Sequence, residues 1–197
     1  LLSHLGIRAF ILEGQPRSDE WQILRIDDKG GVFESAEDIV GLGVYDASEK
    51  LMYRYGKKVG ITLIGPGGEM GMYSAGVQNL DKDGVASRIC ARGGLGAVMG
   101  AKRVKAIVID GANGEKPPLD RPKLFKEARK HYTEKLLAHP QTKSYSDYGT
   151  AAMTAICNGF GALPTRNFSS GQFEHAEAIG GETMRELMLE RGGDSDT

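Results

Sequence analysis

The residues best suited to chemistry lie in one glycine-rich stretch, CARGGLGAVMGAK, which runs from Cys90 to Lys102. Backbone N–H groups with no Cβ crowding them can converge on the oxygens of an anion. Arg88 and Arg92 lie four residues apart at its start, and a guanidinium fork suits a phosphate or the edge of a planar heterocycle. These residue types in this pattern predict an anion-binding loop.

Neither glycine cluster of the chain fits a standard nucleotide-binding loop. A dinucleotide loop needs G-x-G-x-x-G, and Met70 and Met99 stand where the third glycine belongs in the two clusters. A Walker loop needs Gly-Lys-Ser/Thr, whereas one residue separates Gly100 from Lys102. Two interpretations stay open at this point: another anionic ligand, or a tight strand-to-helix turn with no ligand.

Composition narrows the function classes. The chain has 197 residues and a formal net charge of −1, so no overall field favours nucleic acid or a membrane surface. No apolar run approaches the ~18 residues of a membrane span. Cys90 and Cys157 are too far apart for a metal-ligand pair, and we expect both to be reduced in the cytoplasm. The chain lacks an initiating Met, so we expect a piece of something longer.

Hydrophobic periodicity predicts an α+β fold, with an antiparallel or mixed sheet domain followed by a helical segment. In the first part we expect a helix over 95–101 and strands over 7–13, 21–26, 32–35, 59–64 and 104–110. The segment 111–118 is polar and ends in Pro-Pro, which marks a boundary. We therefore expect a β-rich domain over 1–111 and a helical segment over 112–197, with helices over 123–137 and 182–191 and a helix or helical turn over 146–159.

Four stretches resemble the aldehyde:ferredoxin oxidoreductase family of tungsten or molybdenum pterin enzymes. ARGGLGAVMGAKRVKAIVIDG (Ala91–Gly111) is similar to that family's G-R-G-G-x-G-A-V-M-G-S-K-x-L-K-A-I. In the same order along the chain, IRAFILEG, IGPGGE (Ile64–Glu69) and YGTAAMTAICNGFGALPTRNFSSG (Tyr148–Gly171) resemble further family segments. The resemblance spans nearly the whole chain, and its longest motif is specific.

The resemblance implies a role for the glycine-rich loop. In the family the N-terminal sheets form a base for a bis-pterin cofactor that carries the metal, and magnesium bridges the two pterin phosphates. Carried over by position, the cofactor-contacting residues are Arg88, Ile89, Ala91, Arg92, Gly93 and Gly94. The backbone of Ile89 would lie at the magnesium.

The chain departs from the family pattern in two ways. Ala91 and Ala101 stand where the family has Gly and Ser, which puts in doubt any need for positive φ at position 91. The family's C-x-x-C-x-x-x-C cluster ligands and a distant fourth cysteine for a 4Fe–4S cluster lie outside this sequence. We therefore expect the 197-residue chain alone to be inactive.

The resemblance implies a fragment of an enzyme that oxidises aldehydes to carboxylic acids and passes electrons through the iron–sulfur cluster to ferredoxin. Two alternatives remain. One is a domain that binds pterin or a partner chain without catalysis, and the other is an oxidoreductase with the same cofactor and another substrate. A homo-oligomer is compatible with the sequence, whereas nucleic acid and membrane partners are not expected.

Overall fold

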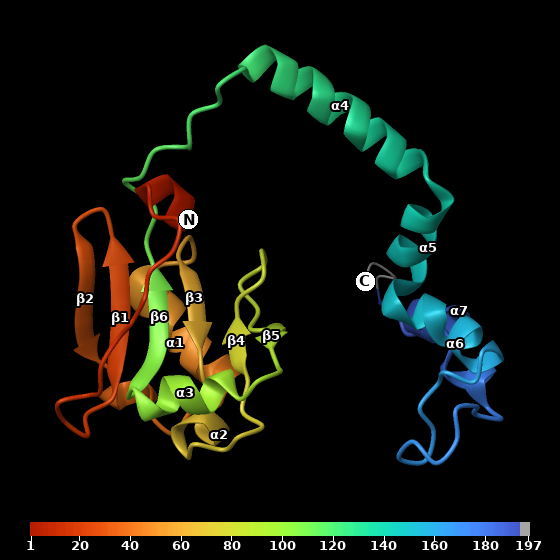
Figure 1. Cartoon of the computed structure of the whole chain (residues 1–197), viewed down its shortest axis with the longest axis horizontal. Coiled ribbons are helices and arrows are strands. Elements are labelled where there is room, and N and C mark those ends of the chain that lie inside the picture. Colours follow the sequence, from red (N-terminus) through yellow and green to blue (C-terminus); the bar gives the residue numbers. More distant parts are fainter. Residues whose placement is uncertain (194–197) are drawn as a thin grey trace. The chain divides into compact units, whose positions relative to one another are not determined.

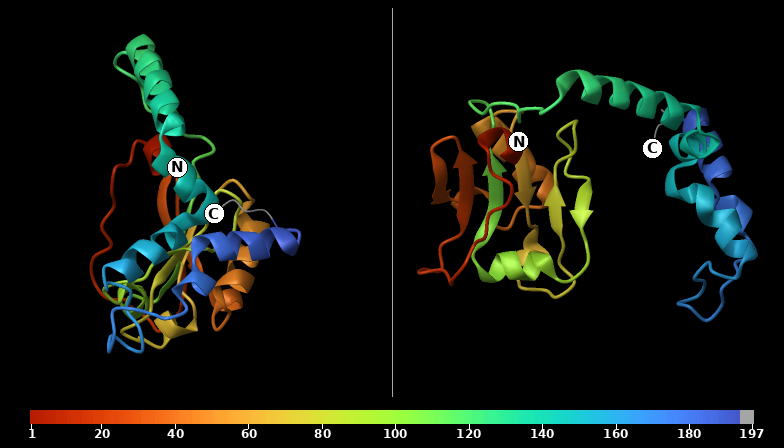
Figure 2. Two further views of the ribbon diagram at one scale, coloured as in Figure 1. Left: turned by 90° about the vertical axis from the view of Figure 1, so that its right-hand side faces the viewer. Right: turned by 45° about the horizontal axis from the view of Figure 1, so that its top comes forward.

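The computed structural model describes residues 1–193 and divides into two compact units, the first over Leu1–Pro118 and the second beginning at Leu119. Both are drawn in Figure 1, and Figure 2 gives two further views. The first unit holds all the strands that the structure describes, and the second is helical. The predicted α+β class, a mixed sheet followed by helices, is confirmed.

The first unit is built on one six-stranded sheet in the order β2-β1-β6-β3-β4-β5. Its strands are β1 (Gln22–Asp27), β2 (Gly30–Ser35), β3 (Gly60–Leu63), β4 (Val77–Asn79), β5 (Arg88–Cys90) and β6 (Val104–Ile109). β1 and β6 are parallel, and every other neighbouring pair is antiparallel. The hairpin predicted over 21–35 is β1 and β2, because the DDKGG turn returns the chain directly.

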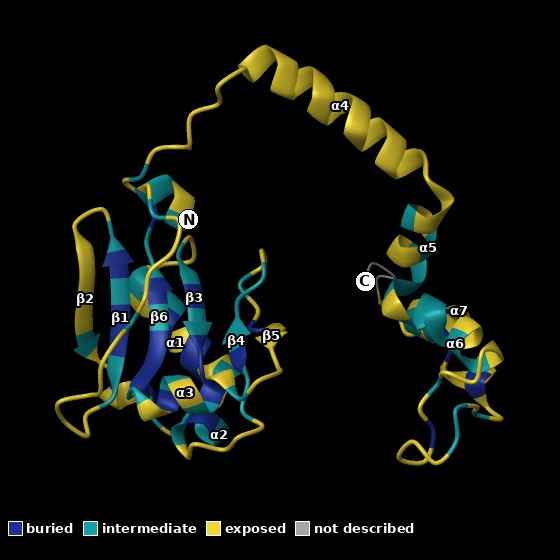
Figure 3. Ribbon diagram, viewed as in Figure 1, coloured by how far each residue is buried: buried dark blue, intermediate teal, exposed yellow. Residues whose placement is uncertain are grey.

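Each face of the sheet carries its own apolar cluster. On one face, helix α1 (Val44–Tyr55) packs Leu51 against Ile23, Ile61 and Val108. On the other face, Leu24, Ile26 and Val104 contact Met99 of helix α3 (Leu95–Ala101) and apolar side chains of the first twelve residues. Figure 1 shows this N-terminal segment and α3 crossing the sheet, and Figure 3 shows the buried strands between the two faces.

A β-bulge in β6 places a lysine in the interior. Gln22 lies opposite Val104 while Ile23 lies opposite Ala106, so Lys105 is an extra residue that breaks the alternation of the strand. Its side chain is fully buried, and Nζ lies 2.5 Å from Oε1 of Glu69.

The ends of the buried ion pair are also held by backbone groups. Lys105 Nζ donates to the carbonyl oxygen of Leu42 at 3.1 Å, and the Glu69 carboxylate accepts from the Gly41 N–H at 2.9 Å. Glu69 is the last residue of helix α2 (Pro66–Glu69). The network therefore fixes α2 to β6 and to the loop before α1.

Two sequence predictions about individual elements need correction, the strand over 7–13 and a single helix over 146–159. Residues 7–13 form no strand, because none of the strands described here pairs with them, and only Ile7 and Leu12 pack against the sheet. Residues 146–159 do not form one helix. Instead α5 (Pro140–Tyr148) ends at Gly149 with a φ of 57°, and a short 3-10 turn (Gly149–Met153) precedes α6 (Thr154–Gly159).

The second unit contains four α-helices among its described residues. Besides α5 and α6 these are α4 (Pro122–Ala138) and α7 (Gly181–Glu190). α4 has no buried residue, as Figure 3 shows, although Leu124, Phe125 and Tyr132 are at helical spacing. Arg185 of α7 lies 3.9 Å from Asp147 of α5, which also pairs with Lys143.

The buried pair yields a prediction about stability. Glu69→Gln keeps an acceptor for the Gly41 N–H but leaves the Lys105 ammonium buried without a counter-charge, so we expect a loss of about 3–5 kcal/mol. Adding Lys105→Met should recover most of that loss, because the uncompensated charge is then gone. Urea unfolding followed by fluorescence of Trp21, the only tryptophan in the sequence, measures both.

The matched control is Asp83→Asn, which removes the carboxylate of the exposed Lys82–Asp83 pair. Exposed pairs contribute little, so this change should stay within about 0.5 kcal/mol. Strictly additive effects of the Glu69 and Lys105 substitutions would contradict the structural role assigned to the pair.

Candidate functional site

The predicted site residues fall on β5 and on the loop that joins it to α3. Arg88, Ile89 and Cys90 form β5, which is the edge strand of the sheet and is exposed along its length. Ala91, Arg92 and Gly93 continue as an exposed loop, and Gly94 is the N-cap of α3. The structure therefore brings these residues together as one continuous stretch.

Three glycines of this stretch serve close backbone packing. A Cβ at Gly94 would lie 2.7 Å from the carbonyl oxygen of Tyr73, and one at Gly96 would lie 2.6 Å from that of Gly76. A Cβ at Gly100 would lie 2.0 Å from the carbonyl oxygen of Gly68 in α2. The alternative structural interpretation thus accounts for these three glycines, since no other residue fits where two backbones approach so closely.

Gly93 differs from them. A Cβ there would meet nothing within 4 Å, and its φ of 85° is the left-handed conformation that glycine adopts most readily. Gly94 follows with a φ of 66°. Ala91 is not at positive φ, so the alanine that replaces the family's glycine is accommodated without backbone strain.

The loop presents unsatisfied donors to solvent. Within the described part of the chain, the N–H groups of Arg92, Gly93 and Gly94 donate to no acceptor, and the Arg92 guanidinium makes no hydrogen bond or ion pair. The Arg88 guanidinium contributes to lowering the pKa of Asp81, after the hydrogen bonds from Ser87 and Val85. Consecutive free N–H groups beside a cation are the arrangement that binds anionic oxygens.

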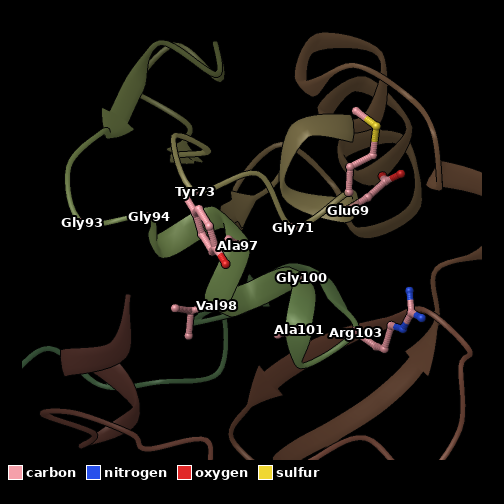
Figure 4. A pocket seen from close by; sticks show the side chains of 11 residues that line it. Glu69, Gly71, Tyr73, Gly93, Gly94, Ala97, Val98, Gly100, Ala101 and Arg103 are labelled. Carbon is pink, nitrogen blue, oxygen red and sulfur yellow. The ribbon is translucent and has the colours of Figure 1, made fainter.

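A groove of about 590 Å³ begins at this loop and runs along the outer face of α3. Gly93 and Gly94 line one part of it, and Glu69 and Arg103 line another. Tyr73, Ala97 and Val98 also line the groove, as Figure 4 shows. The side chains of Ala97 and Ala101 on the α3 side of the groove are small, so a flat group could approach α3 closely there.

Sequence reasoning missed the residues that support the loop from within the sheet. Asn79 of β4 hydrogen-bonds to β3 and to β5, and the Lys105–Glu69 pair holds α2 beneath α3. The one signal in the sequence for the Lys105–Glu69 pair was the lysine inside the otherwise apolar VKAIVI. Among residues 1–193 no three His, Cys, Asp or Glu side chains gather as a metal site, and Cys90 and Cys157 are free thiols.

The fold and the loop together define a sheet domain that presents free backbone donors and an unpaired arginine at its edge, among the described residues. Residues 1–111 match the family described as "Aldehyde ferredoxin oxidoreductase, N-terminal domain", and residues 127–195 match "Aldehyde ferredoxin oxidoreductase, domains 2 & 3". The chain belongs to the aldehyde ferredoxin oxidoreductase family, as its motifs predict.

Relatives named "Tungsten-containing aldehyde ferredoxin oxidoreductase" align along almost the whole chain. The protein from Pyrococcus abyssi is 36% identical over 192 residues, which are 96% of this chain and 30% of that relative. Those from Pyrococcus horikoshii and Thermococcus kodakarensis are 35% and 34% identical with the same coverage. The chain thus spans 30% of the length of these curated relatives.

Solved structures share the fold, and one of them matches most of this chain. It is described as "Active site complex BamBC of Benzoyl Coenzyme A reductase in complex with 1,5 Dienoyl-CoA" and superposes with a TM-score of 0.53 at 20% sequence identity. The match covers 81% of this chain and 20% of that one. None of the helices in the described residues is both long and apolar enough to cross a membrane.

The glycine packing predicts unequal effects of adding one methyl group. Gly100→Ala should destabilise the first unit by about 3 kcal/mol, because its Cβ cannot occupy the space of the Gly68 carbonyl oxygen. Gly31→Ala is the control: its Cβ would meet only Leu24 Cδ1 at 3.5 Å. Removing a glycine from strand β2 should be neutral or stabilise by up to about 0.5 kcal/mol. Urea unfolding decides, and equal effects at both sites would refute the close α2–α3 contact.

Proposed function

We propose that the protein to which this chain belongs oxidises aldehydes to carboxylic acids with a tungsten bis-pterin cofactor, and that this chain supplies part of the cofactor site. The single observation that carries the proposal is the loop Ala91–Gly94, where free N–H groups lie beside the unpaired Arg92 guanidinium. Family membership and the tungsten in the names of the relatives support the choice of cofactor.

The residues present fit such a group. A pterin that carries a phosphate is flat and anionic, and the loop offers bare backbone at Gly93 together with the side chains of Arg88 and Arg92. In this proposal Arg88 and Arg92 would hold pterin or phosphate, and the backbone of Ile89 would lie at the magnesium. When bound, the cofactor supplies the two-electron oxidation, and the chain's part is to bind and orient it.

The remaining parts of the proposal concern the complete protein. Electrons would leave through a 4Fe–4S cluster, whose cysteine ligands lie outside this sequence, to ferredoxin as the partner in the cytoplasm. The same proposal holds if the cofactor carries molybdenum in place of tungsten. Aldehyde-dependent reduction of a redox dye by the complete, metal-loaded protein tests the activity. Bound tungsten without turnover of any aldehyde would favour a non-catalytic pterin-binding role.

The loop chemistry predicts the effect of removing Arg92. A charge-assisted hydrogen bond contributes about 1.5–3 kcal/mol, so Arg92→Ala should lower the retained tungsten at least tenfold without changing the fold. Arg92→Lys should restore it only in part, because an ammonium cannot bridge two acceptors in one plane. The tungsten-to-protein ratio of the complete protein, measured beside circular dichroism, gives the result.

Arg17→Ala serves as the control, because Arg17 is another exposed loop arginine of the first unit with no hydrogen bond or ion pair among the described residues. It should retain full metal content. Equal tungsten in the wild type and in both Arg92 variants would remove Arg92 from the site.

A further inference from the structure

One side-chain amide connects the three strands at the functional edge of the sheet. The hydroxyl of Thr62 on β3 donates to Oδ1 of Asn79 on β4 at 2.7 Å. Nδ2 of Asn79 donates across to β5, to the carbonyl oxygen of Arg88 at 3.3 Å and to the sulfur of Cys90 at 3.6 Å. Asn79 therefore uses both ends of its amide, one toward the sheet interior and one toward the edge.

The orientation of the amide follows from its partners. A backbone carbonyl oxygen can only accept a hydrogen bond, so the amide nitrogen must face Arg88. Oδ1 then faces Thr62, whose hydroxyl can donate to it. Both ends of the group are thus assigned by chemistry, and only a side chain that carries a donor and an acceptor together can replace it.

β5 has little else to hold it. It is three residues long, it is the edge strand, and all three residues are exposed. Its backbone pairs only with β4, with Val77 opposite Cys90, Gln78 opposite Ile89 and Asn79 opposite Arg88. On the other face of the sheet the Ile89 side chain lies over Gly76, where a Cβ would come within 2.7 Å of it. The Asn79 bonds are the side-chain hydrogen bonds that join β5 to the sheet within the described residues.

We propose that Asn79 is the positioning residue for the cofactor loop: with Thr62 behind it, its amide fixes the strand from which Ala91–Gly94 emerges. This inference rests on the proposed function of that loop. Asn79 touches backbone and a thiol, and it acts on the cofactor through Arg88 and the residues that follow. An amide donor lost at this point frees the edge strand while the remaining strands keep their pairing.

Hydrogen–deuterium exchange of the complete protein without its cofactor tests the positioning step. Asn79→Ala and Asn79→Asp each remove the donor to Arg88, so we expect the amides of Arg88–Cys90 that pair with β4 to exchange about tenfold faster. The β1–β2 hairpin should exchange at the wild-type rate. Gln78→Met is the matched control, because Gln78 is the next residue on the same strand and its buried Oε1 has no partner among the described residues.

Two substitutions at Thr62 keep the test sharp if Asn79 variants fold poorly. Thr62→Val removes the hydroxyl and keeps the shape, so exchange at Arg88–Cys90 should rise as well. Thr62→Ser keeps the hydroxyl and should restore the slow exchange. Faster exchange across the whole first unit in every variant would mean a general structural role and would overturn the proposal, as would unchanged exchange at Arg88–Cys90.

Tungsten content separates this inference from the proposed function. If both hold, Asn79→Asp and Thr62→Val lower retained tungsten several-fold, whereas Gln78→Met and Thr62→Ser do not. Faster local exchange with full tungsten in these variants and in Arg92→Ala would refute the cofactor role of the loop. The role of Asn79 in fixing β5 would still stand. Loss of tungsten in Arg92→Ala alone, with unchanged exchange in the Asn79 variants, would refute the positioning role and leave the cofactor loop standing.

Discussion

The buried ion pair between Lys105 and Glu69 is the contact on which the arrangement of the site depends. It fixes the end of α2 to the bulge of β6, and α2 in turn meets α3 where the Gly68 carbonyl oxygen approaches Gly100. α3 starts at Gly94, directly after the exposed loop. A buried charge destabilises the protein unless its partner and hydrogen bonds are fixed, so this network tolerates little displacement. Because α3 packs on α2, the end of the loop at Gly94 is fixed as well.

The loop itself combines a fixed frame with a free surface. Gly94 and Gly96 are held by carbonyl oxygens that leave no room for a side chain, whereas Gly93 stands in open space. Close packing accounts for Gly94 and Gly96, whereas it does not account for Gly93. Close packing sets the position of α3, and the one uncrowded glycine next to Arg92 leaves backbone donors accessible to a ligand.

Much of the fold could be predicted from the sequence, because period and turn chemistry act locally. The hairpin around DDKGG and helix α3 over Leu95–Ala101 are where the pattern places them. The segment 7–13 has the same apolar character as a strand, but a strand exists only if another pairs with it, and no local pattern supplies that partner. The bulge at Lys105 and the amide of Asn79 depend on register between distant strands, which one sequence does not encode visibly.

Lys105 and Arg92 carry the same charge and have opposite roles, and burial explains the difference. Lys105 is enclosed, so it must be neutralised within the chain, and its partner Glu69 makes it a structural group. Arg92 is exposed and unpaired among the described residues, so water screens its charge and folding gains nothing from it. If a flat anion bound there and excluded water from the loop, its attraction to the Arg92 guanidinium would be severalfold stronger than in water, since the effective dielectric constant falls. The free protein, by contrast, carries this cation at the sheet edge with little effect on its stability.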